Sequence, residues 1–347
     1  MYHYENNKPK ILVILTGGTI CSSTNDEGQR YSNAENVKII GHYQKSNSPF
    51  SGKVDFDKEI PLDTLSENMT VARWNTLLEA LKAVNYTNYK GIIILHGTDT
   101  LAYTASLLAI TLAGMPIPVC LVSSQLPLDK EGTNGHANFR AAVELIMNGI
   151  APNVYAVYRN SDNIIYAHFG AQLLQCKNYS DDFFSRGMTP VSAENARWEG
   201  LPFRTNHLYL QKIEKLSSCV LKIVPYVGLD YNAFHLEGIR AIVHGTYHSQ
   251  SVCVERSQGA GEYSSASILQ LIDRCNEKDI PVFLAPCSPE AAKYESTGDA
   301  VGHGAGHICK TTNEMAYIKV LVGCALGLNQ QALETFVNED INNECIY

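Results

Sequence analysis

The stretch ILVILTGGTI, residues 11–20, places an unbroken apolar run directly before two glycines and a threonine. A run that is apolar on both faces is typical of a strand buried within a parallel sheet. GIIIL at 91–95 and PIPVCLV at 116–122 repeat this pattern, and a helical pattern follows each of them. The alternation of short apolar runs and helices predicts an α/β fold with a largely parallel sheet.

Length and pattern together predict two domains. A chain of 347 residues exceeds the usual size of one hydrophobic core. The alternation breaks down from Ser185 to about Ser218 and then resumes with VLKIVPY, GIRAIVHG and IPVFLAP. The acidic, Asn-rich tail from Asn338 onward is expected to fray. The predicted division is an N-terminal domain at 1–200, a linker at 201–216 and a smaller α/β domain at 217–347.

Composition and charge exclude several classes of partner. The formal net charge is -8, with no run of Lys or Arg, whereas binding to nucleic acid needs clustered cations. No apolar stretch approaches the roughly 20 residues needed to cross a bilayer, and the start, MYHYENNKPK, lacks the apolar core of a signal peptide. Ten cysteines without a CxxC pair, several inside apolar runs, indicate reduced thiols. We therefore expect a cytoplasmic protein that binds neither nucleic acid nor membrane.

Polar residues follow each of the three apolar runs. They are Thr16–Thr19 after the first run, His96–Thr100 after the second and Ser123–Gln125 after the third. Each segment alone also fits an ordinary role as a tight turn, a helix N-cap or a core hydroxyl. Ligands bind beyond the carboxyl ends of the strands in open α/β sheets. The coincidence of the three segments therefore predicts a small-molecule pocket at this edge.

Thr19 is the candidate nucleophile in this pocket. A threonine hydroxyl is a weak nucleophile and needs a positioned base. The Gly17-Gly18 turn lets backbone N–H groups face a substrate and form an oxyanion site, and the Asp99 carboxylate could hold a substrate ammonium group. GxSxG, HExxH and GxxxxGK motifs are absent, and TGGTICS does not fit the GxGxxG fingerprint of dinucleotide-binding proteins.

Two segments are similar to the signatures of the bacterial-type L-asparaginase/glutaminase family. TGGTI at 16–20 and HGTDT at 96–100 occur in the order and approximate separation of that family. Three supporting segments are LSENMT at 65–70, SSQLPL at 123–128 and GTNGHANF at 132–139. LSENMT resembles the substrate loop as it occurs in archaeal tRNA-dependent amidotransferases. The resemblance implies a type I-like enzyme with a flavodoxin-like N-terminal domain, no metal or organic cofactor, and a homodimer or homotetramer.

The resemblance also implies roles for the catalytic residues. Thr19 matches the threonine that attacks the side-chain amide and becomes acylated. Thr98 matches a second catalytic threonine, and Asp99 matches the neighbour that holds the substrate's α-amino group. Tyr31 is the expected tyrosine of a mobile lid, although an alignment on Gly28 would place Gln29 there.

Three further residues are expected to contact the substrate. Ser66 and Glu67 lie in the loop that reaches the α-carboxylate and the amine. Ser124 lies where a main-chain carbonyl of the family meets the amide nitrogen. The expected substrate is therefore a small molecule that carries a side-chain amide.

The largest departure from the family lies in GAQLLQCKNYSDDFF, residues 170–184. The family has a lysine here that bonds the second threonine, and an ungapped alignment places Gln175 at that position and Gln172 at a family arginine. Glutamine supplies neither a cation nor a base. Lys177 could serve if the loop is remodelled, and Asn134 likewise stands where the family has an aspartate.

Three interpretations follow from this departure. The chain hydrolyses the side-chain amide of L-asparagine with a base such as Lys177, acts on a different amide, or binds an amino acid without hydrolysis. An amidase component of a tRNA-dependent amidotransferase is a further alternative, although only about ten residues precede the first predicted strand. A metal site is not expected, because glycines surround His303 and His307 in GHGAGH.

Overall fold

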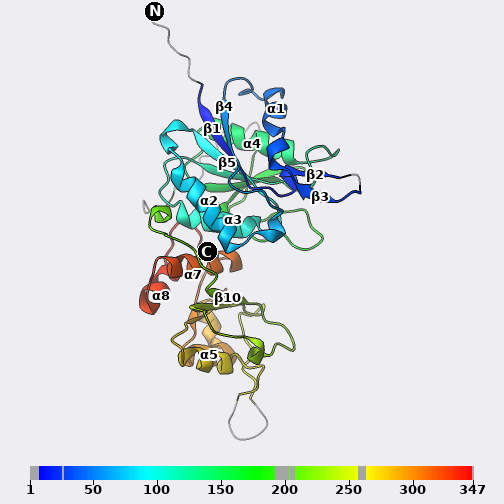
Figure 1. Cartoon of the computed structure of the whole chain (residues 1–347). Helices are drawn as coiled ribbons and strands as arrows, with labels where there is room; N and C mark the ends of the chain where they lie inside the picture. Colours follow the sequence, from blue (N-terminus) through cyan, green and yellow to red (C-terminus); the bar gives the residue numbers. More distant parts are fainter. Residues whose placement is uncertain (1–7, 26, 192–202, 204–207, 257–262, 346–347) are drawn as a thin grey trace, which may run out of the picture. The chain divides into compact units, whose positions relative to one another are not determined.

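The computed structural model describes residues 8–25, 27–191, 203, 208–256 and 263–345. The chain divides into two compact units (Figure 1). The first unit comprises Met1–Lys212 with Ile341–Asn343, and the second comprises Ile213–Asp340 with Glu344–Tyr347. In the part of the chain that is described, no helix is long and apolar enough to cross a membrane.

The first unit is built on a 7-stranded sheet in the order β4-β1-β5-β6-β7-β8-β9. Neighbours from β4 to β7 run parallel, whereas β8 is antiparallel to both β7 and β9. The strands are β1 Lys10–Leu15, β4 Asp55–Glu59, β5 Gly91–Leu95, β6 Val119–Val122, β7 Val154–Arg159, β8 Ile165–Phe169 and β9 Thr189–Pro190. The α/β fold with a largely parallel sheet is therefore confirmed.

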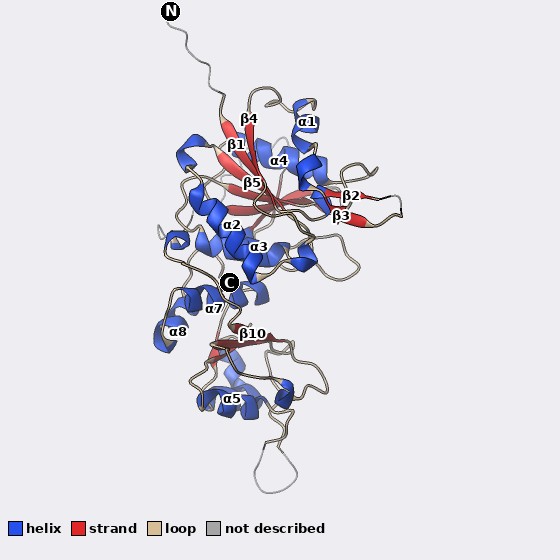
Figure 2. Cartoon of the chain, viewed as in Figure 1, coloured by secondary structure: helices blue, strands red, loops and turns tan. Residues whose placement is uncertain are grey.

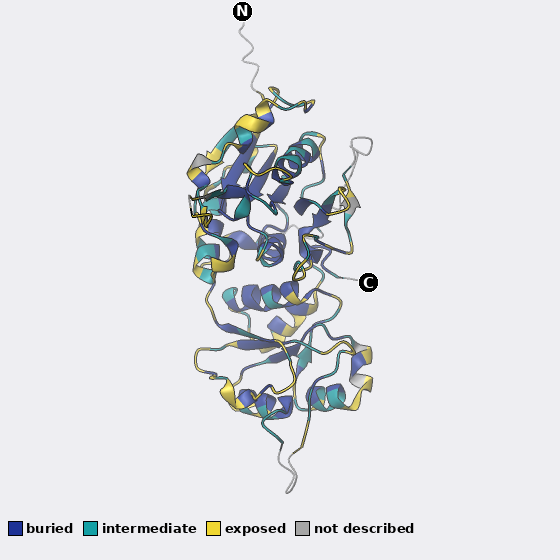
Figure 3. Ribbon diagram, turned by 90° about the vertical axis from the view of Figure 1, so that its right-hand side faces the viewer, coloured by how far each residue is buried: buried dark blue, intermediate teal, exposed yellow. Residues whose placement is uncertain are grey.

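Helices cover both faces of this sheet (Figure 2). The face of β1 that carries Ile11, Val13 and Leu15 belongs to a core that includes side chains of α1 and α4. Figure 2 shows α2 and α3 on the other face, and Figure 3 shows the strands as a buried layer. The helices are α1 Ile39–Gln44, α2 Val71–Ala83, α3 Leu101–Thr111 and α4 Gly135–Met147. A short antiparallel hairpin, β2 Ser22–Thr24 and β3 Arg30–Ser32, follows β1.

The second unit has a smaller sheet of four parallel strands in the order β10-β11-β12-β13. The strands are β10 Val220–Ile223, β11 Ala241–His244, β12 Val282–Leu284 and β13 Gly306–His307. The helices are α5 Ile268–Asn276, α6 Glu295–Gly302, α7 Asn313–Ala325 and α8 Gln330–Asn338. Because α5 presents one apolar face, its residues Ile268, Leu271 and Ile272 pack into the core of this unit.

The end of the chain differs from its prediction. The tail was expected to fray, but Ile341 and Asn342 are fully buried in the first unit. The Asn342 amide donates to the Ala109 carbonyl of α3 at 2.9 Å. Glu344 is fully buried in the second unit, 2.6 Å from the ammonium group of Lys319. These polar side chains remain ordered because each has a buried partner.

The segment predicted to break the pattern also contains regular structure. The strand β9 pairs with β8 at the edge of the large sheet. A 3-10 helix at Tyr209–Gln211 belongs to the first unit and contacts α2 and α3. Of the predicted linker, residues 201, 202 and 204–207 lie outside the described residues.

Candidate active site

The loops that follow β1 and β5 contact each other through two glycines. These strands are parallel neighbours with Leu15 opposite Leu95, so their carboxyl ends meet at one edge. A Cβ atom on Gly18 would lie 2.2 Å from the Gly97 Cα atom, and Gly18 has a φ of +77°. Only glycine permits both this approach and this conformation. The contact brings together the loops that carry Thr19 and Thr98, the residues immediately after each glycine.

The Gly18 amide has a structural role. Its N–H donates to the Thr64 carbonyl at 2.8 Å, which ties the first loop to the segment before Ser66. The Gly18 N–H is therefore not one of the backbone N–H groups that this turn could offer to a substrate. The glycine pair is needed for close packing of backbones, since Gly17 also lies against Thr64.

Ser66 and Asp99 form the best-defined polar contact of the site. The buried Ser66 hydroxyl donates to the Asp99 carboxylate at 2.9 Å, and the Asp99 backbone N–H donates to the same hydroxyl oxygen at 3.1 Å. The Thr100 hydroxyl donates to the Ser66 carbonyl at 3.0 Å. The structure thus joins two residues that the sequence predicted for the site and adds Thr100, a member of the second polar segment to which the sequence analysis gave no separate role.

The reactive groups at this edge remain accessible. Thr19 and Thr98 are half-buried, and Asp99 is exposed although its carboxylate accepts the bond from Ser66. Thr19 begins a 3-10 helix, Thr19–Cys21, whose first carbonyl accepts a bond from the Ser22 hydroxyl at 2.9 Å. This edge therefore offers two threonine hydroxyls and a carboxylate to a small ligand.

Gln175 contacts the second of these loops. Its amide nitrogen donates to the backbone carbonyl of Asp99, and this contact fixes which end of the amide is the oxygen. The oxygen Oε1 is buried without a hydrogen-bond partner among the described residues. Gln175 therefore binds the backbone of the loop that carries Thr98 and Asp99.

A cavity of about 320 Å³ lies beside Gln175. It is lined by Thr98, Asp99, Gln125, Tyr158, Gln175, Cys176, Lys177, Asn178, Tyr179, Ser180, Asp181 and Phe183. Lys177 is exposed and lies in the lining together with Thr98. Gln125 and Tyr158 were missed, although Gln125 is the last residue of the third polar segment.

The hairpin after Thr19 carries the two alternative lid residues. Tyr31 pairs with Ser23 across the strands and is 47% exposed. Gln29 is occupied within the turn, where its side chain and backbone bond Asn25. Of the two alternatives, the side chain that the turn does not engage is therefore that of Tyr31. The end of this hairpin is bonded to Asp63, whose carboxylate accepts bonds from the hydroxyl of Ser32 and, at 3.0 Å, from the N–H of Ala34.

The other predicted contacts differ in what they can offer a ligand. The Ser124 side chain is fully buried, and its hydroxyl bonds the Leu126 carbonyl and, at 2.9 Å, the Thr133 hydroxyl. Ser124 can therefore offer a ligand only main-chain atoms. Glu67 is exposed on the first turn of a 3-10 helix, Ser66–Asn68, where its carboxylate faces solvent.

His96 is a buried residue whose ring helps to hold the loop that carries Thr98. Its Nδ1 bonds the Gly97 carbonyl at 2.7 Å, and its Nε2 bonds the Thr104 hydroxyl at 3.0 Å. Because a carbonyl can only accept, Nδ1 carries the proton of the neutral ring, and Nε2 accepts from the Thr104 hydroxyl, which also accepts the Trp74 indole N–H at 3.0 Å. Complete burial lowers the pKa of His96 to about 4, so the ring is neutral at pH 7.

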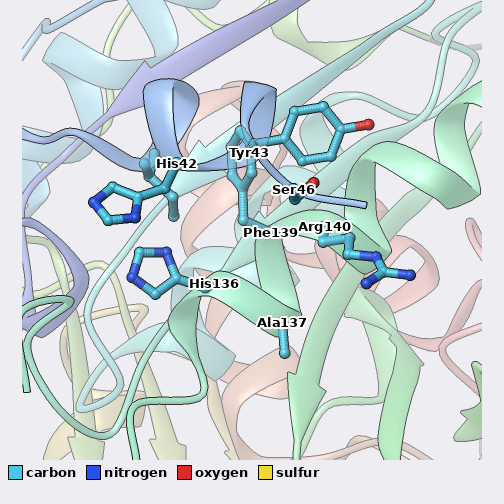
Figure 4. A pocket seen from close by; sticks show the side chains of 8 residues that line it. His42, Tyr43, Ser46, His136, Ala137, Phe139 and Arg140 are labelled. Carbon is cyan, nitrogen blue, oxygen red and sulfur yellow. The ribbon is translucent and has the colours of Figure 1, made fainter. Parts of the chain in front are cut away.

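A second cavity, of about 340 Å³, lies between α1 and α4 in the same unit (Figure 4). The rings of His42 and His136 stack there with centroids 4.7 Å apart. None of the residues predicted for catalysis lines this cavity. Within the described ranges, no group of three or more His, Cys, Asp or Glu side chains could hold a metal ion.

Sequence comparison identifies relatives of the chain. A family model described as "Asparaginase, N-terminal" matches residues 10–198. A glutamyl-tRNA(Gln) amidotransferase subunit of Saccharolobus solfataricus is 31% identical over 239 residues, which cover 65% of this chain and 52% of that protein. L-asparaginase 1 of Escherichia coli is 33% identical over 150 residues, 41% of each protein. The chain spans about half the length of the curated relatives it matches.

Solved structures share the two-domain fold. The thermostable L-asparaginase from Thermococcus kodakarensis gives a TM-score of 0.75 at 20% identity, over 97% of this chain and 99% of that chain. L-asparaginase I from Vibrio cholerae gives a TM-score of 0.70 at 19% identity, over 98% and 100%. The family model covers more than half of the chain. The protein therefore belongs to the asparaginase family.

Proposed function

We propose that the protein is an amidohydrolase that converts the side-chain amide of L-asparagine, or of a related amino acid, into a carboxylate and ammonia. The observation that carries the proposal is the reciprocal bonding of Ser66 and Asp99 beside the contact between Gly18 and Gly97. This arrangement presents two threonines and a carboxylate at one edge of the sheet.

In the proposed reaction, the Thr19 hydroxyl oxygen attacks the amide carbon. The hydroxyl proton passes through a base to the amide nitrogen, the C–N bond breaks and ammonia leaves, so that an ester to Thr19 remains. Water then attacks the ester and restores the hydroxyl. Thr19 suits this role because it is half-buried at a strand end, within reach of a small ligand.

Asp99 is proposed to bind the α-ammonium group of the substrate. Its carboxylate is exposed, and the Ser66 hydroxyl holds one of the two oxygens at 2.9 Å. A charged hydrogen bond from the substrate can therefore reach the other oxygen. Glu67 and the main chain at Ser124 are proposed as further substrate contacts, and Tyr31 as the lid residue.

Lys177 is proposed as the base in place of the family lysine. Gln175 cannot accept the Thr98 proton, and its amide nitrogen is occupied by the Asp99 carbonyl. Lys177 lines the same cavity as Thr98 and has the amine that the reaction needs.

The proposed enzyme is a homodimer or a homotetramer. Light scattering, which measures the mass of the assembly in solution, tests this part of the proposal.

A second candidate function is that of an amidase component in a larger amidotransferase. It is favoured by the 31% identity to a protein named as a glutamyl-tRNA(Gln) amidotransferase subunit. In that role the chain would release ammonia for a partner enzyme instead of releasing it to solvent. Ammonia production that stays slow with every free amino acid would favour this candidate.

The test is ammonia release from L-asparagine, L-glutamine and a panel of other amides, with thermal shift measured on the same compounds. We expect turnover of at least one amino acid that carries a side-chain amide. No turnover together with a thermal shift would overturn the proposal in favour of a binding protein.

A further inference from the structure

Asp63 binds the hairpin that follows Thr19 through both oxygens of its carboxylate. One oxygen accepts the Ser32 hydroxyl at the end of β3, and the other accepts the backbone N–H of Ala34 at 3.0 Å. A bond to Ala34 alone would be an ordinary contact with the first turn of a short helix. The second bond, from Ser32, extends the attachment of Asp63 to the strand that pairs with β2.

The same hairpin is bonded to the short helix that Thr19 begins. The backbone N–H of Asn33 donates to the Cys21 carbonyl at 2.8 Å, and Ser22 pairs with Ser32 across the two strands. Cys21 is the last residue of this helix and is buried. A shift of the hairpin at Ser32 or Asn33 is therefore transmitted to Thr19.

The residue after Asp63 is bonded to the chain on the other side of Thr19. The Thr64 carbonyl accepts the Gly18 N–H at 2.8 Å, and the Thr64 N–H donates to the Thr16 carbonyl at 3.1 Å. Two adjacent residues, Asp63 and Thr64, thus hold the segments that follow and precede Thr19. These hydrogen bonds form a ring around the candidate nucleophile, and the Asp63 carboxylate closes it.

We propose that Asp63 is a positioning residue for Thr19, an inference that rests on the proposed role of Thr19 as the nucleophile. Asp63 acts through the hairpin and not through contact with the substrate. A displacement of about 1 Å at a reacting group can slow a reaction by roughly 10²-fold. Loss of the Asp63 carboxylate therefore lowers kcat, whereas KM changes little because Ser66 and Asp99 still bind each other.

The test is steady-state ammonia release by variants of the full-length protein. Asp63→Ala should lower kcat by roughly 10²-fold without a comparable rise in KM. Asp63→Asn should be intermediate, because its amide keeps one of the two acceptor oxygens. Asp63 is exposed, so neither change leaves a cavity in the core, and the unfolding midpoint should stay near that of the wild-type protein. A wild-type kcat in Asp63→Ala, or a rise in KM alone, would overturn the proposal.

A double variant tests whether Asp63 acts through the hairpin. Ser32→Ala removes the hydroxyl that Asp63 binds, so the protein with both alanines should be no slower than Asp63→Ala alone. Losses of kcat that multiply would contradict this route. Asp57→Ala is the matched control and should keep the wild-type kcat. The Asp57 carboxylate on β4 also accepts two bonds, from the Tyr89 hydroxyl at 3.0 Å and from the Lys10 ammonium group at 3.2 Å.

Hydrogen exchange distinguishes failure of this inference from failure of the proposed function, because it needs no substrate. The backbone N–H groups of Cys21 and Asn33 are both hydrogen-bonded within the ring. In Asp63→Ala they should exchange at least about 10-fold faster than in the wild-type protein, whereas in Asp57→Ala they should not. Unchanged exchange would overturn the positioning role even if the protein hydrolyses amides. A wild-type protein that releases no ammonia from any amide would instead overturn the proposed function, and faster exchange would still show that Asp63 fixes the hairpin.

Discussion

Ser66 and Asp99 bind each other in both directions: the Ser66 hydroxyl donates to the Asp99 carboxylate at 2.9 Å and accepts the Asp99 backbone N–H at 3.1 Å. A single buried hydroxyl thereby orients a carboxylate that is otherwise exposed. Because the pair lies beside the two glycines that join the loops, its geometry decides how a substrate ammonium group would be held.

Replacing Ser66 should weaken substrate binding. A hydrogen bond to a charged group is worth about 1.5–3 kcal/mol, so Ser66→Ala should raise KM by roughly 10- to 100-fold. The value of kcat should change less, because the reacting amide lies elsewhere. Steady-state ammonia release measures both constants. Ser51→Ala, which removes a hydroxyl bonded to the Gln44 carbonyl away from the site, is the control and should leave KM unchanged.

An alanine at Gly18 should abolish activity and destabilise the first unit. The added Cβ would lie 2.2 Å from the Gly97 Cα atom, so the two loops must separate. Gly149→Ala is the matched control, since Gly149 also has a positive φ, of +81°, but an added Cβ there would have nothing within 4 Å. It should cost about 1 kcal/mol of stability and leave turnover intact. Equal loss of activity in both variants would mean that the glycine contact is irrelevant.

Lys177→Ala should slow turnover roughly 10²–10⁴-fold if this side chain supplies the base. Gln175→Lys should restore part of the lost rate in the Lys177→Ala background, because it places an amine beside the same cavity. The measurement is kcat at saturating amide. An unchanged rate in Lys177→Ala would exclude Lys177 as the base. Lys212→Ala, at an exposed lysine that does not line the cavity, is the control.

The first unit should lose stability as the solution becomes acidic. Burial lowers the pKa of His96 to about 4 and that of His168 to about 3, whereas an unfolded histidine titrates near 6.5. Below pH 6.5 the unfolded chain binds protons that the folded chain excludes, so stability falls from pH 6.5 toward pH 4. Each histidine should contribute roughly 2 kcal/mol of loss between pH 7 and pH 5.

Urea midpoints at pH 7 and pH 5 test this dependence. His168→Gln should reduce the difference between the two midpoints. His235→Gln, at a histidine outside the first unit, should keep the difference of the wild-type protein. A difference that is the same in all three proteins would contradict the assignment.

The central strands could be predicted because their apolar runs are buried on both faces. The strands β1 and β5 appeared in the sequence as unbroken apolar stretches. The edge strand β4, with the sequence DFDKE, was missed because it pairs only with β1 and its residues are largely exposed. The tail was wrongly predicted because its burial depends on distant partners, such as Ala109 for Asn342.

The position of part of the candidate site could be predicted for a similar reason. Thr19, Thr98 and Asp99 follow apolar strands, so the rule for parallel sheets placed them at one edge. The bonds that Asp99 accepts from Ser66 and Gln175 join segments whose contact no local sequence pattern encodes. The engaged amide of Gly18 could not be predicted either, since its partner Thr64 lies on another loop.

The most direct test of the central claim is the rate of ammonia release by Thr19→Ala, measured on the best amide substrate of the wild-type protein. Thr76→Ala, at a threonine of α2 away from the site, is the matched control and should retain full activity. The account predicts that Thr19→Ala loses at least about 10³-fold in kcat/KM while its unfolding midpoint is unchanged. A Thr19→Ala protein that releases ammonia at the wild-type rate would contradict it.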